Sequence, residues 1–510
     1  MPQWLKKKLY VPNIIRKELG YAGEVLFTEH HEAHAASAFY PSPFQNAAIL
    51  TVDGVGEWAT ASYGIGENSR IKLFKEMLFP DSLGLLYSAF TYFCGFRINS
   101  GEYKLMGLAP YGSPRYKDII VSKLIDIKDD GSLRLNQEYF DYLGGLRMTN
   151  KKFEQLFGGA ARKPESEITR REMDIAASIQ QVTEEILVRM AFHVHRETKM
   201  DNLCMAGGVA LNCVANSHIL RQSPFKNLWI QPAAGDAGGA LGAAFSVWYR
   251  FLENPRTAIA NIDELHCTYI GPAYSNTEIV QFLDRNKYPY HAMPKESRAR
   301  IIAERISRGR IIGYFAGRME FGPRALGARS ILGDARSLDT QSTMNLKIKY
   351  RESFRPFAPS VLEEQASNYF EIDRPSPYML LVANVKESRR LPRIVNDSTT
   401  ILERLKEKRS NIPAVTHLDY SARLQTVNAR AKPDYYAIIK EFEKLTGCAV
   451  IVNTSFNVRG DPIVCSPQDA YKCFMRTEMD DLVLEDCILH KCEQPAWPEG
   501  KEWQRDLILD

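Results

Sequence analysis

Two histidines near the N-terminus have the spacing of a pair of metal ligands. They lie in the stretch EHHEAHAASAF, from Glu29 to Phe39, where His30 and His34 are four residues apart. On a helix, residues i and i+4 lie on one face, so both imidazoles would reach one ion, whereas His31 would point elsewhere. An isolated pair of this kind is weak evidence, and an ordinary polar helix face explains it equally well.

Two carboxylates at strand ends favour the metal interpretation. Asp53 closes the apolar run AAILTVD and precedes a glycine turn, and Asp236 lies in the loop GDAGG after another apolar run. Two imidazoles and two carboxylates suit Fe(II), Mn, Zn or Co, and the residue types do not choose among these metals.

Two glycine-rich loops are candidates for binding a nucleotide. Gly207 and Gly208 follow the apolar run NLCMA and precede a predicted helix, and Gly235 begins a similar turn further along. Backbone amides at such a turn, together with a helix N-terminus, can meet a phosphate or the edge of a nucleoside. Asn212 lies just beyond the first turn and completes this group. The alternative is a tight strand-to-helix turn with nothing bound.

A strongly basic segment predicts a site for a polyanion. Its two motifs are GRMEFGPRALGARS, with Arg318, Arg324 and Arg329, and NLKIKYRESFRPFAPS, with Lys347, Lys349, Arg351 and Arg355. Alternation in KIKYR predicts a strand that presents Lys347, Lys349 and Arg351 on one face. The alternative is a solvated strand face. Asn453 and Ser455 follow a buried strand and are short polar groups suited to a phosphate or a carbonyl.

The elements that must position these residues indicate α/β architecture. Apolar runs between 47 and 76 predict three strands with glycine turns, and residues 168–197 carry apolar residues at helical spacing. Two strand–loop–helix units follow, which predicts a mostly parallel sheet with ligands at the strand C-terminal ends. We expect one domain over residues 1–265, a second α/β domain over 275–490 and a C-terminal tail over 491–510.

Composition limits the classes of function. The chain has 510 residues, enough for two to four domains, and a net charge of +4, too even to predict nucleic-acid or membrane binding from charge alone. It has no apolar run of transmembrane length, and its nine cysteines never form a CxxC pair. Reduced thiols in a cytoplasmic enzyme are the simplest expectation, and a homodimer is the default for the oligomeric state. Five histidines are predicted to be isolated and ordinary: His218, His266, His291, His417 and His490.

Taken together, these motifs resemble those of the NodU/CmcH family of O-carbamoyltransferases. The matching segments run in order along the chain: EHHEAHAASAF, SGEYKLMGLAPYG, AGGVALN, AAGDAGGALG, FGPRALGARS, FRPFAPS and VNTSFN. The resemblance implies a Kae1-like domain with the actin-like ATPase (RNase H-like) fold, followed by a YrdC-like α/β domain. It implies that ATP and carbamoyl phosphate give carbamoyl-adenylate in the second domain. The carbamoyl group then passes to an acceptor hydroxyl at an iron site in the first.

The same resemblance implies roles for individual residues. The Fe(II) ligands would be His30, His34, Asp53 and Asp236, and Mg would accompany ATP. The adenylation site would comprise Arg324, Lys349, Arg355, Asn453 and Ser455, with Arg351 a weaker candidate. Lys349 and Arg355 would be catalytic. The acceptor would be a sugar or a secondary metabolite.

The resemblance is incomplete at the N-terminus. Family members normally begin with a strand–turn–strand segment, carrying an Asn and a His-Asp pair, ahead of the region where this chain starts. We therefore expect an incomplete first domain, in which Asp141 of YFDYLGG is the remaining acceptor-side carboxylate. Two alternatives remain. One is a tRNA threonylcarbamoylation factor, which the fused domain order and weak charge disfavour. The other is a remnant that binds nucleotide and metal without transferring anything.

Overall fold

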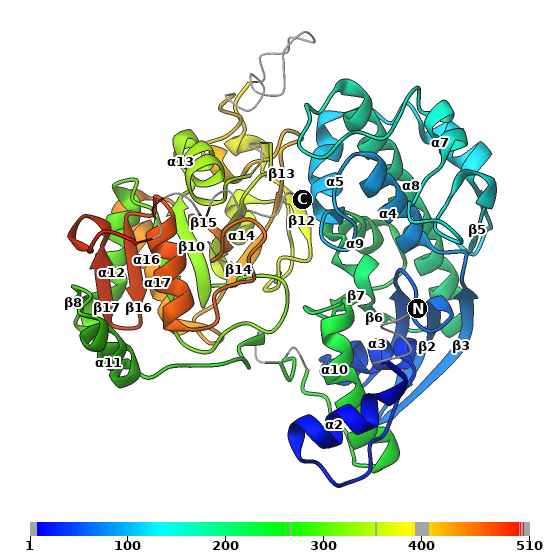
Figure 1. Ribbon diagram of the computed structural model, residues 1–510, viewed down its shortest axis with the longest axis horizontal. Coiled ribbons are helices and arrows are strands. Elements are labelled where there is room, and N and C mark those ends of the chain that lie inside the picture. The colour runs from blue at the N-terminus through cyan, green and yellow to red at the C-terminus, as the bar shows by residue number, and fades with distance from the viewer. Residues whose placement is uncertain are drawn as a thin grey trace.

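The chain folds into two α/β units that lie side by side (Figure 1). The computed structural model describes residues 8–260, 262–265, 268–351, 354–392, 407–498, 500 and 503. The prediction for His266 and most of the predicted tail beyond residue 498 lie outside these residues. None of the helices in the described ranges is both long enough and apolar enough to cross a membrane.

The first unit is built on a five-stranded sheet in the order β3-β2-β1-β6-β7. Its strands are β1 (Asn46–Val52), β2 (Ala59–Glu67), β3 (Arg70–Leu78), β6 (Asn202–Ala206) and β7 (Asn227–Ile230). The three predicted N-terminal strands are confirmed, and they pair antiparallel. Only β1, β6 and β7 run parallel, so the sheet is mixed rather than mostly parallel. The connections between β1, β2 and β3 are short, and only the first contains glycine. They permit only hairpins, because a parallel connection needs a longer crossover.

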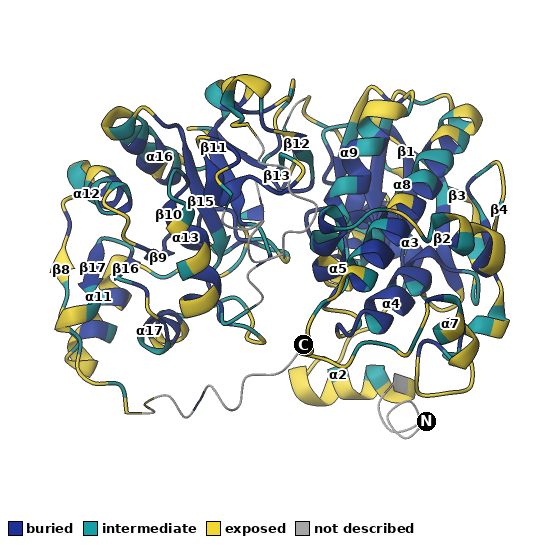
Figure 2. Ribbon diagram, turned by 90° about the horizontal axis from the view of Figure 1, so that it is seen from above, coloured by how far each residue is buried: buried dark blue, intermediate teal, exposed yellow. Residues whose placement is uncertain are grey.

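Helices cover this sheet and carry the candidate residues. They are α3 (His30–Phe39), α4 (Leu83–Phe93), α5 (Glu102–Leu108), α7 (Lys151–Leu156), α8 (Arg170–Thr198), α9 (Cys213–Gln222) and α10 (Asp236–Phe245). The predicted long amphipathic helix is α8, and its apolar stripe is buried against the sheet and its neighbours. A small hairpin, β4 (Ile125–Ile127) and β5 (Leu133–Leu135), lies at the periphery. Near the N-terminus, α2 (Val11–Leu19) has no buried residue (Figure 2).

The second unit is built on an eight-stranded sheet in the order β14-β11-β15-β10-β9-β16-β17-β8. Its strands are β8 (His291–Ala292), β9 (Ile312–Phe315), β10 (Arg329–Asp334), β11 (Ala358–Leu362), β14 (Gln425–Val427), β15 (Val450–Ser455), β16 (Asp481–Leu484) and β17 (Cys487–His490). Most neighbours pair antiparallel; β11 with β14 and β9 with β16 are the parallel pairs. The strands predicted from RIIGYFAG and CAVIVNTSF are β9 and β15.

The second unit has its own set of helices and a separate hairpin. The helices are α11 (Asn276–Asn286), α12 (Lys295–Ser307), α13 (Leu338–Thr343), α14 (Ala366–Tyr369), α16 (Pro433–Thr446) and α17 (Pro467–Arg476). The hairpin consists of β12 (Val382–Asn384) and β13 (Ser421–Arg423), and it faces the first unit (Figure 1).

The two units share buried contacts. The apolar core around α8 includes side chains that the second unit contributes, among them Phe354 and Leu418. Hydrogen bonds also cross the junction: the Tyr111 hydroxyl donates to the Phe354 carbonyl at 2.9 Å, and the Val382 amide donates to Ser217 Oγ at 2.7 Å. The junction is therefore a packed interface.

Candidate metal centre and anion cavity

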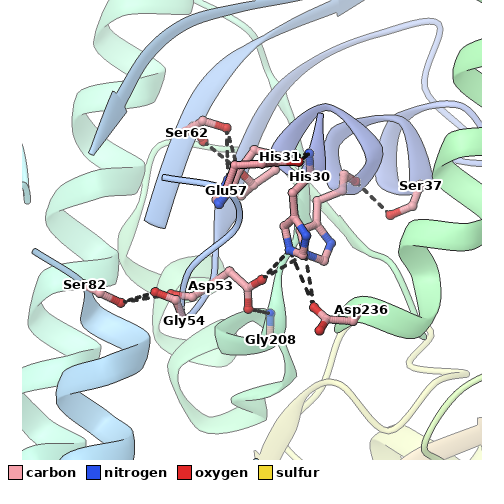
Figure 3. A network of polar contacts seen from close by, with 12 residues as sticks. His30, His31, Ser37, Asp53, Gly54, Glu57, Ser62, Ser82, Gly208 and Asp236 are labelled. Carbon is pink, nitrogen blue, oxygen red and sulfur yellow. Dashed lines mark hydrogen bonds and ion pairs between the residues drawn. The ribbon is translucent and has the colours of Figure 1, made fainter. Parts of the chain in front are cut away.

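Four predicted metal ligands converge at the C-terminal end of β1 (Figure 3). His30 and His34 lie on successive turns of α3, and Asp53 follows β1. The His30 and His34 Nε2 atoms are 2.9 Å apart, and they lie 2.9 and 3.0 Å from Asp53 Oδ2. Asp236, the first residue of α10, places Oδ1 3.6 Å from His30 Nε2 and 3.9 Å from His34 Nε2.

Hydrogen bonds within this cluster shift the pKa values of its side chains. A hydrogen bond to Asp53 raises the pKa of His30 despite the opposing effect of burial. Burial alone would raise the pKa of Asp53, but hydrogen bonds from His30 and His34 bring that pKa well below its usual range. His34 is buried, and its Nδ1 has no hydrogen-bond partner. The Asp236 side chain is 83% exposed, so the cluster opens to the surface on that side.

His31 is excluded from the cluster, as the helical spacing predicts. Its Nδ1 lies 2.7 Å from Thr51 Oγ1 on the neighbouring strand, and burial lowers its pKa to about 4. Glu57 adds a contact that sequence patterns did not indicate. Its carboxylate accepts the His30 backbone amide at 3.1 and 3.2 Å, so it holds the start of α3.

The turn at Gly207 and Gly208 contacts the candidate metal cluster. The Gly208 amide donates to Asp53 Oδ1 at 2.9 Å and thereby orients the carboxylate (Figure 3). Gly207 has φ +92°, and a Cβ there would lie 2.2 Å from the Val52 carbonyl oxygen, so the close approach of β1 and β6 requires glycine. The tight-turn alternative accounts for both residues.

Asn212 and Gly235, the other two predicted nucleotide contacts, have local structural roles. The Asn212 and Gln180 side-chain amides bond to each other at 3.0 and 3.1 Å, and Asn212 Oδ1 also accepts the Ala215 amide at the start of α9. Gly235 is the N-cap of α10, whose first residue is Asp236.

A cavity of about 650 Å³ lies between the two units and collects the predicted adenylation residues. Arg324, Lys349, Arg351, Arg355, Asn453 and Ser455 all line it. The first unit contributes Tyr103 of α5 and Glu184 of α8, and the second unit adds Asp419 and Arg423. The basic motifs and the polar residues after β15, far apart in sequence, thus belong to one site.

The KIKYR segment is not a strand, and that prediction is wrong. Residues Met344–Ile348 form a short π-helical turn that continues α13, and Lys349 caps it. Lys347 therefore lies on the surface, where its ammonium pairs with Glu478 at 3.1 Å. A helical turn rotates successive side chains by about 100°, so Lys347 and Lys349 cannot share the face that alternation would give them.

Lys349 is buried and tethered to the turn after β15. Its Nζ donates to the Ser455 carbonyl, to Ser455 Oγ at 3.2 Å, and to the carbonyl and Oδ1 of Asn457 at 2.9 and 2.7 Å. Burial, followed by the charge of Arg351, lowers its pKa well below the usual range. Lys349 therefore holds Ser455 and the turn after β15 in place on the cavity wall.

Two arginines lie close together in the cavity without an acid beside them. Neither Arg324 nor Arg423 forms an ion pair within the described part of the chain, and Arg324 Nε is buried without an acceptor. Burial, followed by the charge of Arg423, lowers the pKa of Arg324. Arg423 comes from the strand β13, and no motif in the sequence singled it out. Its signal was only an arginine in an alternating run, SARLQTV.

Arg355 and Arg351 have aromatic neighbours. The Arg355 guanidinium lies 4.6 Å from the ring centroid of Tyr103, which belongs to the other unit. Arg351 lies 4.8 Å from the Phe357 ring and donates to Asn345 Oδ1 at 2.7 Å. The Tyr103 contact links the SGEYKLMG motif to the basic segment across the junction.

Asn453 lines the cavity; its Nδ2 is engaged inside the protein, and its buried Oδ1 has no hydrogen-bond partner. Its Nδ2 lies 3.2 Å from the Ala325 carbonyl, 3.1 Å from Ser360 Oγ and 2.9 Å from Gln425 Oε1. It therefore supports the loop that carries Arg324.

Asp141 lies away from both sites. It is absent from the cavity lining and from the metal cluster, and its backbone forms a turn with Gly145. Its role as an acceptor-side carboxylate stays a prediction.

The histidines predicted to be isolated are not all isolated. His291, His490 and Glu493 gather on the surface. His490 Nδ1 faces Asp481 at 2.7 Å, and His490 Nε2 faces an Arg305 nitrogen at 3.3 Å, so both of its ring nitrogens are already engaged. His417 is buried at the junction, with its ring edge-on to Tyr111.

Four side chains of metal-ligating types thus meet at the end of β1, and a cavity lined by several cationic side chains lies between the two units. Family models match both units. Residues 1–245 match the carbamoyltransferase N-terminus and residues 303–491 match the carbamoyltransferase C-terminus. The chain belongs to this carbamoyltransferase family, the one that includes the NodU and CmcH types, and it is an enzyme of the carbamoyltransferase class. The predicted family is confirmed.

Three relatives illustrate the range of the family. An uncharacterized protein of Synechocystis is 55% identical over 100% of this chain and 85% of its own length. The nodulation protein NolNO of Sinorhizobium fredii is 35% identical over 98% of this chain and 69% of its own. The 3'-hydroxymethylcephem-O-carbamoyltransferase of Streptomyces clavuligerus is 30% identical over 62% of this chain and 53% of its own.

Proposed function

We propose that this carbamoyltransferase uses ATP and carbamoyl phosphate to form carbamoyl-adenylate in the cavity. The carbamoyl group then passes to a hydroxyl of a sugar or a secondary metabolite. The observation that carries the proposal is the pair Arg324 and Arg423, which line one cavity with Arg355 and have no carboxylate partner among the described residues. Partly buried cations without acids are unfavourable unless an anion joins them.

The residues of the cavity have complementary tasks in this proposal. Arg324, Arg355 and Arg423 bind phosphate oxygens and offset the repulsion between two anionic substrates. Lys349 holds Ser455 and the turn after it. Because the cavity lies between two packed units, it limits the access of water to an adenylate that hydrolyses readily.

The four ligands of the metal cluster fit a divalent ion. No placement of protons gives equally good hydrogen bonds among His30 Nε2, His34 Nε2 and Asp53 Oδ2. One ion bound between these three atoms would contact all of them. Two histidines and one carboxylate would hold the ion through His30 Nε2, His34 Nε2 and Asp53 Oδ2, and the metal in this proposal is Fe(II). Asp236 would be the fourth, adjustable ligand.

When bound, the metal would act as a Lewis acid toward the carbamoyl donor. The chain's own residues set the geometry for this. Gly208 and Glu57 fix Asp53 and the start of α3, and the open side beside Asp236 admits the acceptor. In the proposed scheme the first unit is Kae1-like and the second YrdC-like. The mixed five-stranded sheet and the separate mainly antiparallel sheet are compatible with that assignment.

The test is a reaction with purified protein, ATP, Mg, carbamoyl phosphate and Fe(II), with and without hydroxyl-bearing acceptors. We expect an AMP-linked carbamoyl product whose formation requires both substrates. Arg324→Ala should abolish it, and Arg389→Ala, which removes an arginine stacked on Tyr369 away from the cavity, should not. An adenylate without transfer would restrict the proposal to the first step. Absence of the adenylate at every combination of Mg and Fe(II) would refute the proposal.

A further inference from the structure

The loop between β9 and β10 carries Arg324 into the cavity, and one buried carboxylate organises it. Glu320 lies within this loop and is 4% exposed. Its Oε1 accepts the Leu326 amide at 2.6 Å, the Ala328 amide at 2.7 Å and, less closely, the Arg329 amide at 3.4 Å. One oxygen thus closes the loop on itself across the segment that bears Arg324.

The opposite side of the same segment is held through its carbonyls. Gln425 Nε2 donates to the Leu326 carbonyl at 2.7 Å, and the Tyr269 hydroxyl donates to the same oxygen at 2.6 Å. Asn453 holds the Ala325 carbonyl. The peptide groups that follow Arg324 are therefore fixed on both sides.

Glu320 makes no ion pair with Arg324 in the described part of the chain, so it acts on the loop and not on the charge of that arginine. The charge of Glu320 acts instead on Arg329 and Lys432: burial lowers the pKa of each, and the charge of Glu320 opposes that shift. Arg329 also stacks 3.5 Å from the Phe315 ring and donates to the carbonyls of Gly317, Ala328 and Pro272.

We propose that Glu320 is a positioning residue that holds Arg324 in the orientation for binding the phosphate groups of a nucleotide. The inference rests on the proposed function of the cavity. A fixed guanidinium binds an anion more tightly than one on a mobile loop, because the cost of ordering the loop is met on folding. Loss of the Glu320 contacts should therefore weaken nucleotide binding through Arg324 specifically.

The experiment is a double-mutant cycle read by calorimetric binding of ATP, with Glu320→Gln, Arg324→Ala and the double variant. Glu320→Gln keeps the shape of the side chain. It offers the Leu326 and Ala328 amides a weaker acceptor and adds an N–H donor. We expect a tenfold or larger rise in the Kd for ATP in the wild-type background. In the Arg324→Ala background the same substitution should change Kd less than twofold.

Two controls separate this role from general stabilisation. Glu371→Gln removes an acid in the same unit that bonds to Asn384 and Arg390, and it should leave Kd unchanged. If Glu320→Gln does not fold, Glu320→Asp keeps the charge and shortens the reach, and the same non-additive pattern is expected. An equal loss in both backgrounds, or no loss in either, would overturn the role of Glu320. If Arg324→Ala itself leaves ATP binding intact, the anion site fails, and the positioning role fails with it.

Discussion

At the scale of single residues, the two sites use polar groups in different ways. In the candidate metal cluster the four side chains lie close to one another, and the Gly208 amide orients Asp53. In the cavity, several residues expected to touch the ligand instead hold other residues: Lys349 holds Ser455, and Asn453 holds the Arg324 loop. The groups left for an anion are mainly guanidiniums, which suits the planar, bidentate recognition of phosphate.

Arg423 provides a residue-scale prediction. Arg423→Ala should raise the Kd for ATP by about 10- to 100-fold, because charge-assisted hydrogen bonds contribute about 1.5–3 kcal/mol each. Removing Arg423 also relieves the repulsion that lowers the pKa of Arg324. Calorimetric titration measures the effect, with Arg389→Ala as the matched control. Unchanged affinity would mean that Arg423 only lines the wall.

Gly208 provides a second residue-scale prediction, for the metal cluster. A Cβ at Gly208 would lie 3.0 Å from Asp53 Oδ1, whereas a Cβ at Gly235 would meet nothing within 4 Å. Gly208→Ala should therefore displace Asp53 and lower Fe(II) affinity by about 10- to 100-fold, as loss of ligand orientation usually does. Gly235→Ala should leave the affinity for Fe(II) unchanged. Metal titration distinguishes the two, and equal affinities would argue against an orienting role for Gly208.

At the scale of elements, helix ends determine where the functional side chains lie. α3 presents two histidines on one face, and α10 begins at Asp236. The turn that extends α13 separates Lys347 from Lys349. α8 spans the first unit and connects the sheet to the cavity through Glu184. Its N-terminus is closed by a capping box between Thr169 and Glu172.

The α8 cap gives a prediction with a pH dependence. Burial alone would raise the pKa of Glu172, but hydrogen bonds from Thr169 and Arg171 lower it. A carboxyl with a lowered folded-state pKa adds stability above its unfolded pKa of about 4.3 and loses it as the pH falls further. Glu172→Gln should therefore cost about 1 kcal/mol at neutral pH and progressively less below about pH 4. Urea unfolding across pH measures this.

Glu167 provides the control for the cap. It is an exposed acid in the loop before α8, and Glu167→Gln should change the free energy of unfolding little at any pH. A pH-independent loss for Glu172→Gln would indicate that the hydrogen-bonding shape of the cap matters and its charge does not.

At the scale of the whole molecule, the junction between the units builds the cavity. Leu418 belongs to the second unit by sequence, but its side chain is buried in the core around α8; Leu424 is buried in the core of the second unit. Each Leu→Ala substitution should cost about 2–5 kcal/mol. Only Leu418→Ala should also reduce hydrogen-exchange protection in α5 of the first unit. Equal protection of α5 in the two variants would show that the junction does not couple the units.

The sequence by itself determined the features that depend on local spacing. The i, i+4 histidines, the carboxylates at strand ends, the long amphipathic helix and the order of the motifs along the chain are all local, and they led to the metal cluster and to the carbamoyltransferase family. Local periodicity failed at KIKYR, because five residues fit an alternating strand as well as a turn that prolongs a helix.

Only the tertiary structure decided which side chains remain available. Whether a polar group meets a ligand or a protein atom depends on neighbours that are about a hundred residues or more away in the sequence. Lys349 meets Asn457, Asp53 meets Gly208, and Arg324 lies beside Arg423. Arg423 and Glu320 carry no signal of their own in the sequence. Their roles arise from packing. Arg423 lies beside Arg324, and Glu320 accepts backbone amides of the loop that carries Arg324.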